Sequence, residues 1–228
     1  MKQIIWLMSL ALVGTSVQAA DSICFGTASR GRLEGRIALP AYGKNFKPYS
    51  ELGVMLGRTF VHSRVERVIV AAYQQLERTL PDRTYLYAES GWKAGGRIRP
   101  HRTHQNGTAV DFLVPVKDGS GNPAVLATGV TNKFGYAYEF DDDAKAEGYT
   151  IDFDAIAAHL LALNSAAQKE GIGLARVILG PRFLPKLFAA KGGAEVKAMV
   201  PFMKGNPWIR HDEHYHVDFA LKCSPYES

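Results

Sequence analysis

Five of the seven histidines in this 228-residue chain lie in two short segments, and no other feature restricts the possible folds as strongly. The segments span residues 101–111 and 210–216 and contain His101, His104, His211, His214 and His216. They lie far apart in the sequence. A fold that uses these histidines together must therefore bring two distant pieces of chain side by side.

The clustered residues are of the types that bind a metal ion. A catalytic zinc site has three protein ligands, often histidine or carboxylate, and keeps a fourth position open to water. His214 and His216 are one residue apart, so on a strand both rings point to the same face. His104 precedes a segment that carries Asp111, and Gly107 lets the chain turn between them. Neither segment holds enough ligands alone, and the sequence predicts that the two are neighbours sharing one zinc site.

Asp111 stands inside an apolar run, residues 109–116, which predicts a buried central strand. A carboxylate in such a place requires a partner, because an unpaired buried charge is costly. Other β-forming runs predict strands at 84–88, 174–179 and 216–221. Helical spacing of apolar residues predicts helices at 63–79, 152–170 and 183–190. Ser63 and Glu66 form a capping box at the start of the first helix.

The remaining stretches carry weaker patterns. Residues 24–50 are expected to form an irregular arm with one strand, and residues 117–150 a solvated loop. His62 and His159 stand alone and are expected to be structural. The order of elements predicts one α+β domain, residues 21–228, with a central, largely antiparallel sheet, flanking helices and the zinc site on the sheet.

The first twenty residues predict a cleaved signal peptide. Lys2 is followed by an apolar run that is too short for a membrane span. The segment ends in the small-residue stretch Val17-Gln18-Ala19-Ala20, which is typical of a cleavage site. Cleavage is expected after Ala19 or Ala20, and we expect a periplasmic protein with no stable membrane span.

Export makes the two cysteines informative. Cys24 lies near the mature N-terminus and Cys223 near the C-terminus, so one disulfide is expected to join the ends of the domain. Two cysteines cannot build a zinc ribbon or a disulfide-dense scaffold. The formal net charge of +5 is spread along the chain without basic–aromatic interleaving, so no nucleic-acid partner is expected.

The two histidine segments resemble the signature of zinc peptidases that share the lysostaphin, D-Ala-D-Ala metallopeptidase and hedgehog metal fold. That signature is His104-x₆-Asp111 followed downstream by His214-x-His216. Within this group, three stretches are similar to penicillin-insensitive murein endopeptidases: residues 94–97, His101-x-x-His104-Gln105-x-Gly107, and His211-x-x-His214-x-His216 with a cysteine shortly after. The resemblance covers most of the mature chain, and its two histidine segments are highly specific.

The resemblance implies roles for single residues. His104, Asp111 and His216 would bind zinc, and His214 would face the water in the open position. His211 and His101 would be further active-site histidines.

The general base stays open at this stage. Glu213 lies three residues before His216, a spacing similar to related zinc D-Ala-D-Ala carboxypeptidases, in which the acid is the base. On an ideal strand Glu213 and His216 face opposite ways, so Glu213 enters the site only if the chain bends before His214. Both His214 and Glu213 remain candidates.

The resemblance implies an endopeptidase that cuts peptide cross-links or stem peptides of peptidoglycan with zinc-activated water. A zinc carboxypeptidase or dipeptidase acting on D-Ala-D-Ala ends is the alternative within the same chemistry. A non-catalytic zinc-containing wall-binding module is the alternative of a different class.

Overall fold

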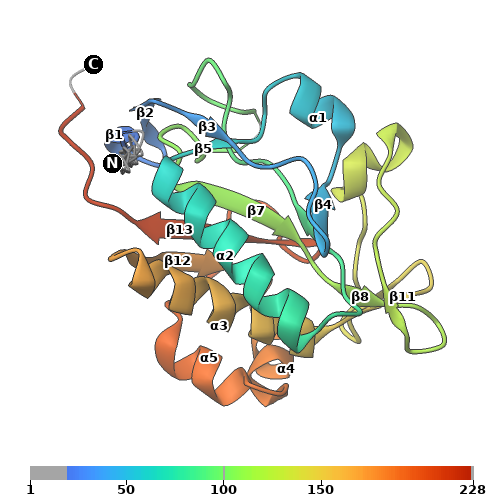
Figure 1. Ribbon diagram of the computed structural model, residues 1–228. Helices are drawn as coiled ribbons and strands as arrows, with labels where there is room; N and C mark the ends of the chain where they lie inside the picture. Colours follow the sequence, from blue (N-terminus) through green and yellow to red (C-terminus); the bar gives the residue numbers. More distant parts are fainter. Residues whose placement is uncertain (1–19, 100, 227–228) are drawn as a thin grey trace, which may run out of the picture.

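The fold is built on a five-stranded sheet with helices against one face. The computed structural model describes residues 20–99 and 101–226 (Figure 1). The sheet has the strand order β12-β13-β7-β6-β4, in which only β4 and β6 run parallel. Its strands are β4 Phe46–Pro48, β6 Tyr85–Tyr87, β7 Ala109–Leu113, β12 Gly173–Ile178 and β13 His214–Ala220. The predicted α+β domain with a largely antiparallel sheet is confirmed.

The two central strands carry apolar side chains on one face and polar side chains on the other. β7 and β13 pair antiparallel, with Phe112 opposite Tyr215 and Asp111 opposite His216. Successive side chains of a strand point to opposite faces, so the aromatic pair and the polar pair lie on opposite sides of the sheet. The Phe112 and Tyr215 rings stack 5.6 Å apart on the apolar side.

Helices α2 Ser63–Thr79 and α3 Phe153–Lys169 cover this apolar side and pack against each other (Figure 1). Both predicted helices are confirmed, but the cap of α2 differs from the prediction. The N-cap is His62, whose Nδ1 accepts a hydrogen bond from the Arg64 backbone N–H, and Ser63 is already helical. His62 is therefore structural, as expected.

His159 on α3 is fully buried in an aromatic cluster. Its ring stacks on Tyr73 at 5.2 Å and meets Phe112 edge-on at 4.8 Å, and its Nδ1 hydrogen-bonds the Tyr215 hydroxyl. Burial lowers the pKa of His159 to about 3, so the ring is neutral. The expectation of a structural histidine is confirmed.

A second helical layer lies below α3 and extends the core. It consists of η2 Pro181–Phe183, α4 Leu184–Ala189 and α5 Gly193–Met199. The helix expected at 183–190 corresponds to α4, whereas α5 was missed. α5 is short and buries only Gly193 and Val196, too few residues to produce a helical period in the sequence.

Two stretches hold more structure than expected. Residues 24–50 form β1 Ile23–Thr27, β2 Arg30–Glu34, β3 Ile37–Ala38 and β4, followed by α1 Glu51–Met55 and β5 Phe60–Val61. Residues 117–150 hold most of a small sheet of β8 Val116–Lys117, β9 Pro123–Ala124, β10 Lys145–Ala146 and β11 Tyr149–Ile151, as well as the short 3₁₀ segment η1 Val130–Gly135. The predictions of an irregular arm and of a solvated loop were wrong. Such short strands pair with distant parts of the chain, and their own sequences show no alternation of apolar and polar residues.

Two strand boundaries also differ from the sequence expectation. The run 109–116 breaks after Leu113: Val114 still donates its N–H to the Glu213 carbonyl at 3.0 Å, but Pro115 has no N–H to extend the pairing. The last strand begins at His214 rather than His216, so both histidines lie on β13.

The chain ends are joined by a disulfide between Cys24 and Cys223, as predicted. Ser224 adds two backbone hydrogen bonds to the β1 region, at 2.9 Å each (Figure 1). The expected signal peptide lies outside the described residues, apart from Ala20. Among residues 20–99 and 101–226, no helix combines the length and the apolar character needed to cross a membrane.

Candidate metal centre

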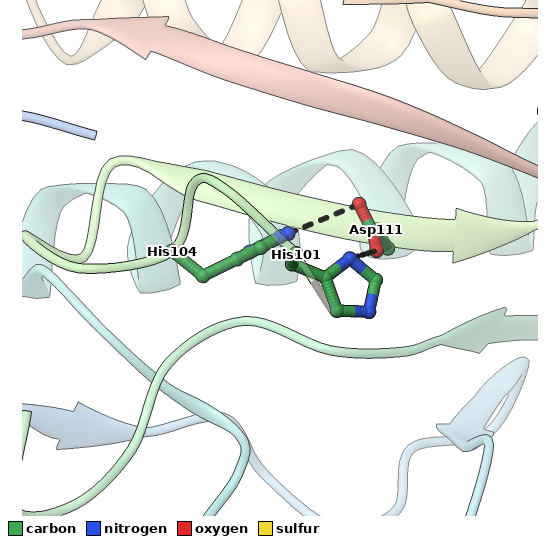
Figure 2. Close-up of side chains that lie close together, drawn as sticks. All are labelled: His101, His104 and Asp111. Atoms are coloured by element: carbon green, nitrogen blue, oxygen red, sulfur yellow. Dashed lines mark ion pairs between the residues drawn. The ribbon is translucent and has the colours of Figure 1, made fainter. Parts of the chain in front are cut away.

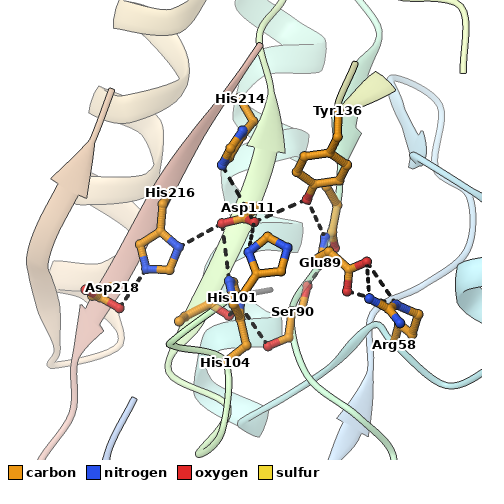
Figure 3. Close-up of polar contacts among 12 residues, drawn as sticks. Arg58, Glu89, Ser90, His101, His104, Asp111, Tyr136, His214, His216 and Asp218 are labelled. Atoms are coloured by element: carbon orange, nitrogen blue, oxygen red, sulfur yellow. Dashed lines mark hydrogen bonds and ion pairs between the residues drawn. The ribbon is translucent and has the colours of Figure 1, made fainter. Parts of the chain in front are cut away.

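Asp111 is the centre of the polar face of the sheet. Its side chain is fully buried, and nitrogens of four histidines approach its two carboxylate oxygens (Figures 2 and 3). The distances to Asp111 are 2.7 Å from His216 Nδ1, 3.4 Å from His104 Nε2, 3.4 Å from His101 Nδ1 and 3.9 Å from His214 Nε2. The structure thus brings both histidine segments together around one carboxylate, as the sequence predicted.

The surrounding histidines keep the Asp111 carboxyl ionised. Burial disfavours the charged form, but the nearby histidines, His104 and His214 foremost, hold the pKa of the carboxyl well below its usual range. A buried anion with four imidazoles around it is a donor set suited to a divalent cation. The ligand atoms of His101, His104 and Asp111 lie within 4.8 Å of one another, close enough to hold a metal ion (Figure 2).

His104 is held with one ring nitrogen free for a metal. Its Nδ1 lies 3.2 Å from the carbonyl oxygens of Ser90 and Ala109, so Nδ1 carries the proton and donates. Nε2 is buried and has no hydrogen-bond partner among the described residues. The backbone of His104 is left-handed, with φ of 69°, an uncommon conformation for a residue with a side chain. Such strain, about 1–3 kcal/mol, is typical of positions where function dictates the geometry.

His216 is oriented by a chain of charged groups behind it. Its Nε2 lies 2.9 Å from Asp218 Oδ1 (Figure 3). Asp218 Oδ2 accepts two hydrogen bonds from Arg176, at 2.8 and 2.6 Å. This leaves Nδ1 directed at Asp111. Burial alone would lower the pKa of His216, but the carboxylates at both ring nitrogens raise it to about 9. A metal ligand histidine commonly has a carboxylate behind it, and Asp218 takes that place.

His214 presents a second free nitrogen to the centre. Its Nδ1 lies 2.8 Å from Glu213 Oε1, and its Nε2 is buried without a hydrogen-bond partner in the described part of the chain. Glu213 lies just before β13 and contacts Nδ1 of His214, the ring nitrogen on the other side from Nε2. Burial would lower the pKa of His214, but Asp111 and Glu213 raise it.

His211 lies beside His214, and His101 lies beside His104. The His211 ring lies 4.5 Å from the His214 ring, and its Nδ1 donates to the Ile209 carbonyl at 2.9 Å. The His101 ring meets the His104 ring edge-on at 5.1 Å. Burial lowers the pKa of both His211 and His101 to about 4, so both rings are neutral at pH 7.

Two residues of the centre were missed in the sequence. Asp218 follows His216 by two residues on the same strand, so alternation along β13 was a signal for it. Tyr136 follows η1 in the stretch expected to be a solvated loop. Its hydroxyl donates to Asp111 Oδ2 at 3.2 Å, and its ring meets those of His214 and His101 at 5.1 and 5.8 Å (Figure 3). Nothing local in the sequence indicates this approach.

A pocket of about 410 Å³ opens beside the centre. His101, His214, Tyr136 and the pair Arg58–Glu89 are among the residues that line it. Glu89 accepts from Arg58 Nε at 2.9 and 3.0 Å, and the Tyr49 hydroxyl donates to it at 2.7 Å. A ligand in this pocket would lie against His214, whose Nε2 has no hydrogen-bond partner in the described part of the chain.

A family model described as penicillin-insensitive murein endopeptidase matches residues 24–228, which is nearly the whole described chain. No match was found among the curated proteins.

Proposed function

Because the chain belongs to the penicillin-insensitive murein endopeptidase family, a family of peptidases that act on peptidoglycan, we propose that it is a zinc-dependent endopeptidase that hydrolyses peptide cross-links. The observation that carries the zinc part is the buried carboxylate of Asp111 with four histidine nitrogens within 3.9 Å. Two of those nitrogens, in His104 and His214, are buried and make no hydrogen bond among the described residues. A bound cation would explain why such costly groups are retained.

We propose His104, Asp111 and His216 as the zinc ligands. His104 and His216 each have the far ring nitrogen hydrogen-bonded to a carbonyl or carboxylate oxygen, which fixes the tautomer and directs the other nitrogen to the centre. His101 has no such support at its far nitrogen in the part of the chain that the structure describes, and it lines the pocket. This difference favours His216 over His101 as the third ligand.

The zinc ion, when bound, supplies a water of lowered pKa and polarises the scissile carbonyl. The protein's own part starts with His214, which takes a proton at Nε2 as the general base. Glu213 stabilises the resulting imidazolium, because its Oε1 lies 2.8 Å from Nδ1. This arrangement favours His214 over Glu213 as the base and gives Glu213 a positioning role. The protonated His214 can return its proton to the leaving amine, and we assign His211 and His101, whose rings lie 4.5 Å from His214 and 5.1 Å from His104, as the further active-site histidines.

A location outside the cytoplasm agrees with a peptidoglycan substrate and with the Cys24–Cys223 disulfide. We propose that residues 1–20 are a cleaved signal peptide, that residues 21–228 form the mature domain, and that the mature enzyme acts in the periplasm.

The deciding experiment is digestion of purified cross-linked muropeptide dimers, followed by mass spectrometry. An endopeptidase gives two monomers of unchanged stem length, whereas a D-Ala-D-Ala carboxypeptidase releases terminal alanine. A chelator should abolish the hydrolysis and zinc should restore it, and a β-lactam should have no effect, since the proposed chemistry uses no acylated serine. Activity that survives complete chelation would refute the zinc mechanism, and binding without any cleavage would favour the non-catalytic module.

The ligand set is tested separately by zinc content. Substituting His104 or His216 with Ala should remove bound zinc. His101→Gln should retain it, because His101 is assigned to the pocket. Zinc loss in His101→Gln together with full zinc in His216→Ala would reverse the assignment.

A further inference from the structure

The pocket beside the centre is bordered by three cationic side chains. Arg58, Lys133 and Arg210 line it together with two carboxylates, Glu89 and Glu213. An incoming anion can use only a cation that the protein's own carboxylates do not already pair.

Two of these cations are already paired. Arg58 forms a bidentate ion pair with Glu89, at 2.7 to 3.0 Å, and its guanidinium stacks on the Trp92 ring at 4.5 Å. Arg210 contacts Glu139 at 2.5 Å and Asp212 at 2.6 Å, and it donates to the Tyr138 carbonyl at 2.9 Å.

Lys133 differs from both arginines. Its side chain is exposed, and within residues 20–99 and 101–226 its ammonium has no carboxylate or hydrogen-bond partner. Lys133 is therefore the cation that is available to an incoming anion.

The backbone holds Lys133 in an unusual conformation. Lys133 and Phe134 have φ of 51° and 57°, two consecutive left-handed residues with side chains. This arrangement costs roughly 1–2 kcal/mol per residue. The side-chain amide of Asn132 secures the turn, accepting from the N–H groups of Gly129 and Gly135 at 2.9 and 3.0 Å and donating to the Ala127 carbonyl at 2.7 Å. A turn that is both strained and secured in this way is a built feature of the pocket wall.

The same turn is tied directly to the centre. Tyr136 N–H donates to the Lys133 carbonyl at 3.3 Å, and the Tyr136 hydroxyl donates to Asp111 at 3.2 Å (Figure 3). Lys133 thus lies three positions before Tyr136, whose side chain touches the proposed zinc ligand Asp111. An anionic group of the substrate held by Lys133 would lie in the pocket that also exposes His101 and His214.

We propose that Lys133 binds a free carboxylate of the peptide substrate close to the scissile bond, and that this contact selects cross-links whose diamino acid keeps that carboxylate unmodified. The inference rests on the proposed peptidase function and adds a specificity residue to it. A cross-link through a diamino dicarboxylic acid carries a free carboxylate next to the amide nitrogen, whereas amidation of that group removes the charge. Lys133 would then distinguish the acid from the amide by charge alone.

The test uses two cross-linked muropeptides that differ only in this group, one a carboxylate and the other a carboxamide. Wild-type protein with zinc should cleave the acid with a kcat/KM about tenfold higher, the effect expected of a charged hydrogen bond at a partly solvated site. The difference should appear in KM with kcat little changed, because the ammonium contacts the carboxylate equally before and during the reaction. Lys133→Gln should abolish the preference by raising KM for the acid alone, and Lys133→Arg should retain it.

Lys186→Gln is the matched control. Lys186 is an exposed lysine on α4 that is not among the residues lining the pocket, so this variant makes the same charge change and should keep the full preference. Equal cleavage of acid and amide by wild type, or an unchanged preference in Lys133→Gln, would overturn the carboxylate site while leaving the peptidase function intact. Failure to cleave either peptide would overturn the proposed function and this inference with it.

Discussion

The contact between Asp218 and His216 gives the sharpest prediction for zinc binding. His216 Nε2 lies 2.9 Å from Asp218 Oδ1, and Arg176 fixes the other oxygen of Asp218 through two hydrogen bonds. Asp218→Ala leaves Nδ1 of His216 free to turn away from Asp111 and removes the carboxylate that strengthens the ring as a ligand. Zinc should still bind, but more weakly.

The expected magnitude follows from this geometry. Loss of a partner behind a ligand histidine lowers metal affinity about 10–100-fold, which corresponds to about 1.4–2.7 kcal/mol. Asp218→Asn keeps an oxygen that accepts from Nε2 but loses the charge, and a neutral hydrogen bond is about half as strong as a charged one. Its zinc affinity should therefore fall about 3–10-fold.

Fold stability is measured separately, because Asp218 is itself buried and pairs with His216 as well as with Arg176. The Arg176 side chain is 40% exposed, so water can hydrate it when Asp218 is removed, whereas His216 stays buried with one carboxylate partner fewer. We expect metal-free Asp218→Ala to lose about 1–3 kcal/mol of unfolding free energy.

Competition with a fluorescent chelator measures the zinc dissociation constant, and urea unfolding of the metal-free protein measures stability. Asp142→Ala is the control for a lost negative charge, because the Asp142 side chain is 92% exposed. Wild-type zinc affinity in Asp218→Ala would refute the reasoning, and an equal loss in Asp142→Ala would reduce it to a general charge effect.

Three further predictions concern the base, the buried histidine and the disulfide. His214→Gln should lower kcat about 10²–10⁴-fold with zinc content unchanged, and Glu213→Gln should lower it less; the reverse order in kinetic assays would make Glu213 the base. The folded-state pKa of His159 is about 3, below the unfolded value of about 6.5, so the unfolded chain binds the extra proton and stability falls as pH drops through this window. From pH 7 to pH 5 the wild-type protein should lose about 2 kcal/mol of unfolding free energy through His159. Urea unfolding should therefore show that the difference in unfolding free energy between wild type and His159→Leu falls by about this amount. A difference that does not change with pH would contradict a buried neutral ring. Replacing Cys24 and Cys223 together by Ser should cost about 3–5 kcal/mol of unfolding free energy, because the bridge spans 199 residues, and an unchanged urea midpoint would show that the bridge contributes nothing.

The long helices and the central strands were predictable because each is defined by neighbours in the sequence. The apolar spacing that predicts α2 and α3 lies within each segment, and so does the apolar run that contains Asp111. The small sheet around β8–β11 escaped prediction, since its two- and three-residue strands depend on partners from distant parts of the chain. The cap of α2 was misassigned for a related reason: Ser63 is drawn into hydrogen bonds with Ser22 and Asp21, and His62 takes its place.

The sequence by itself determined which kinds of side chain gather at the centre. Residue types and the spacing of His214 and His216 were enough to predict a shared metal site, because alternation along a strand is a local property. Tertiary structure decided which groups support that chemistry: Glu213 behind His214, Tyr136 on Asp111, and Lys133 unpaired at the pocket. These contacts depend on strand register and on the path of one strained turn, and both are set by packing between residues far apart in the chain.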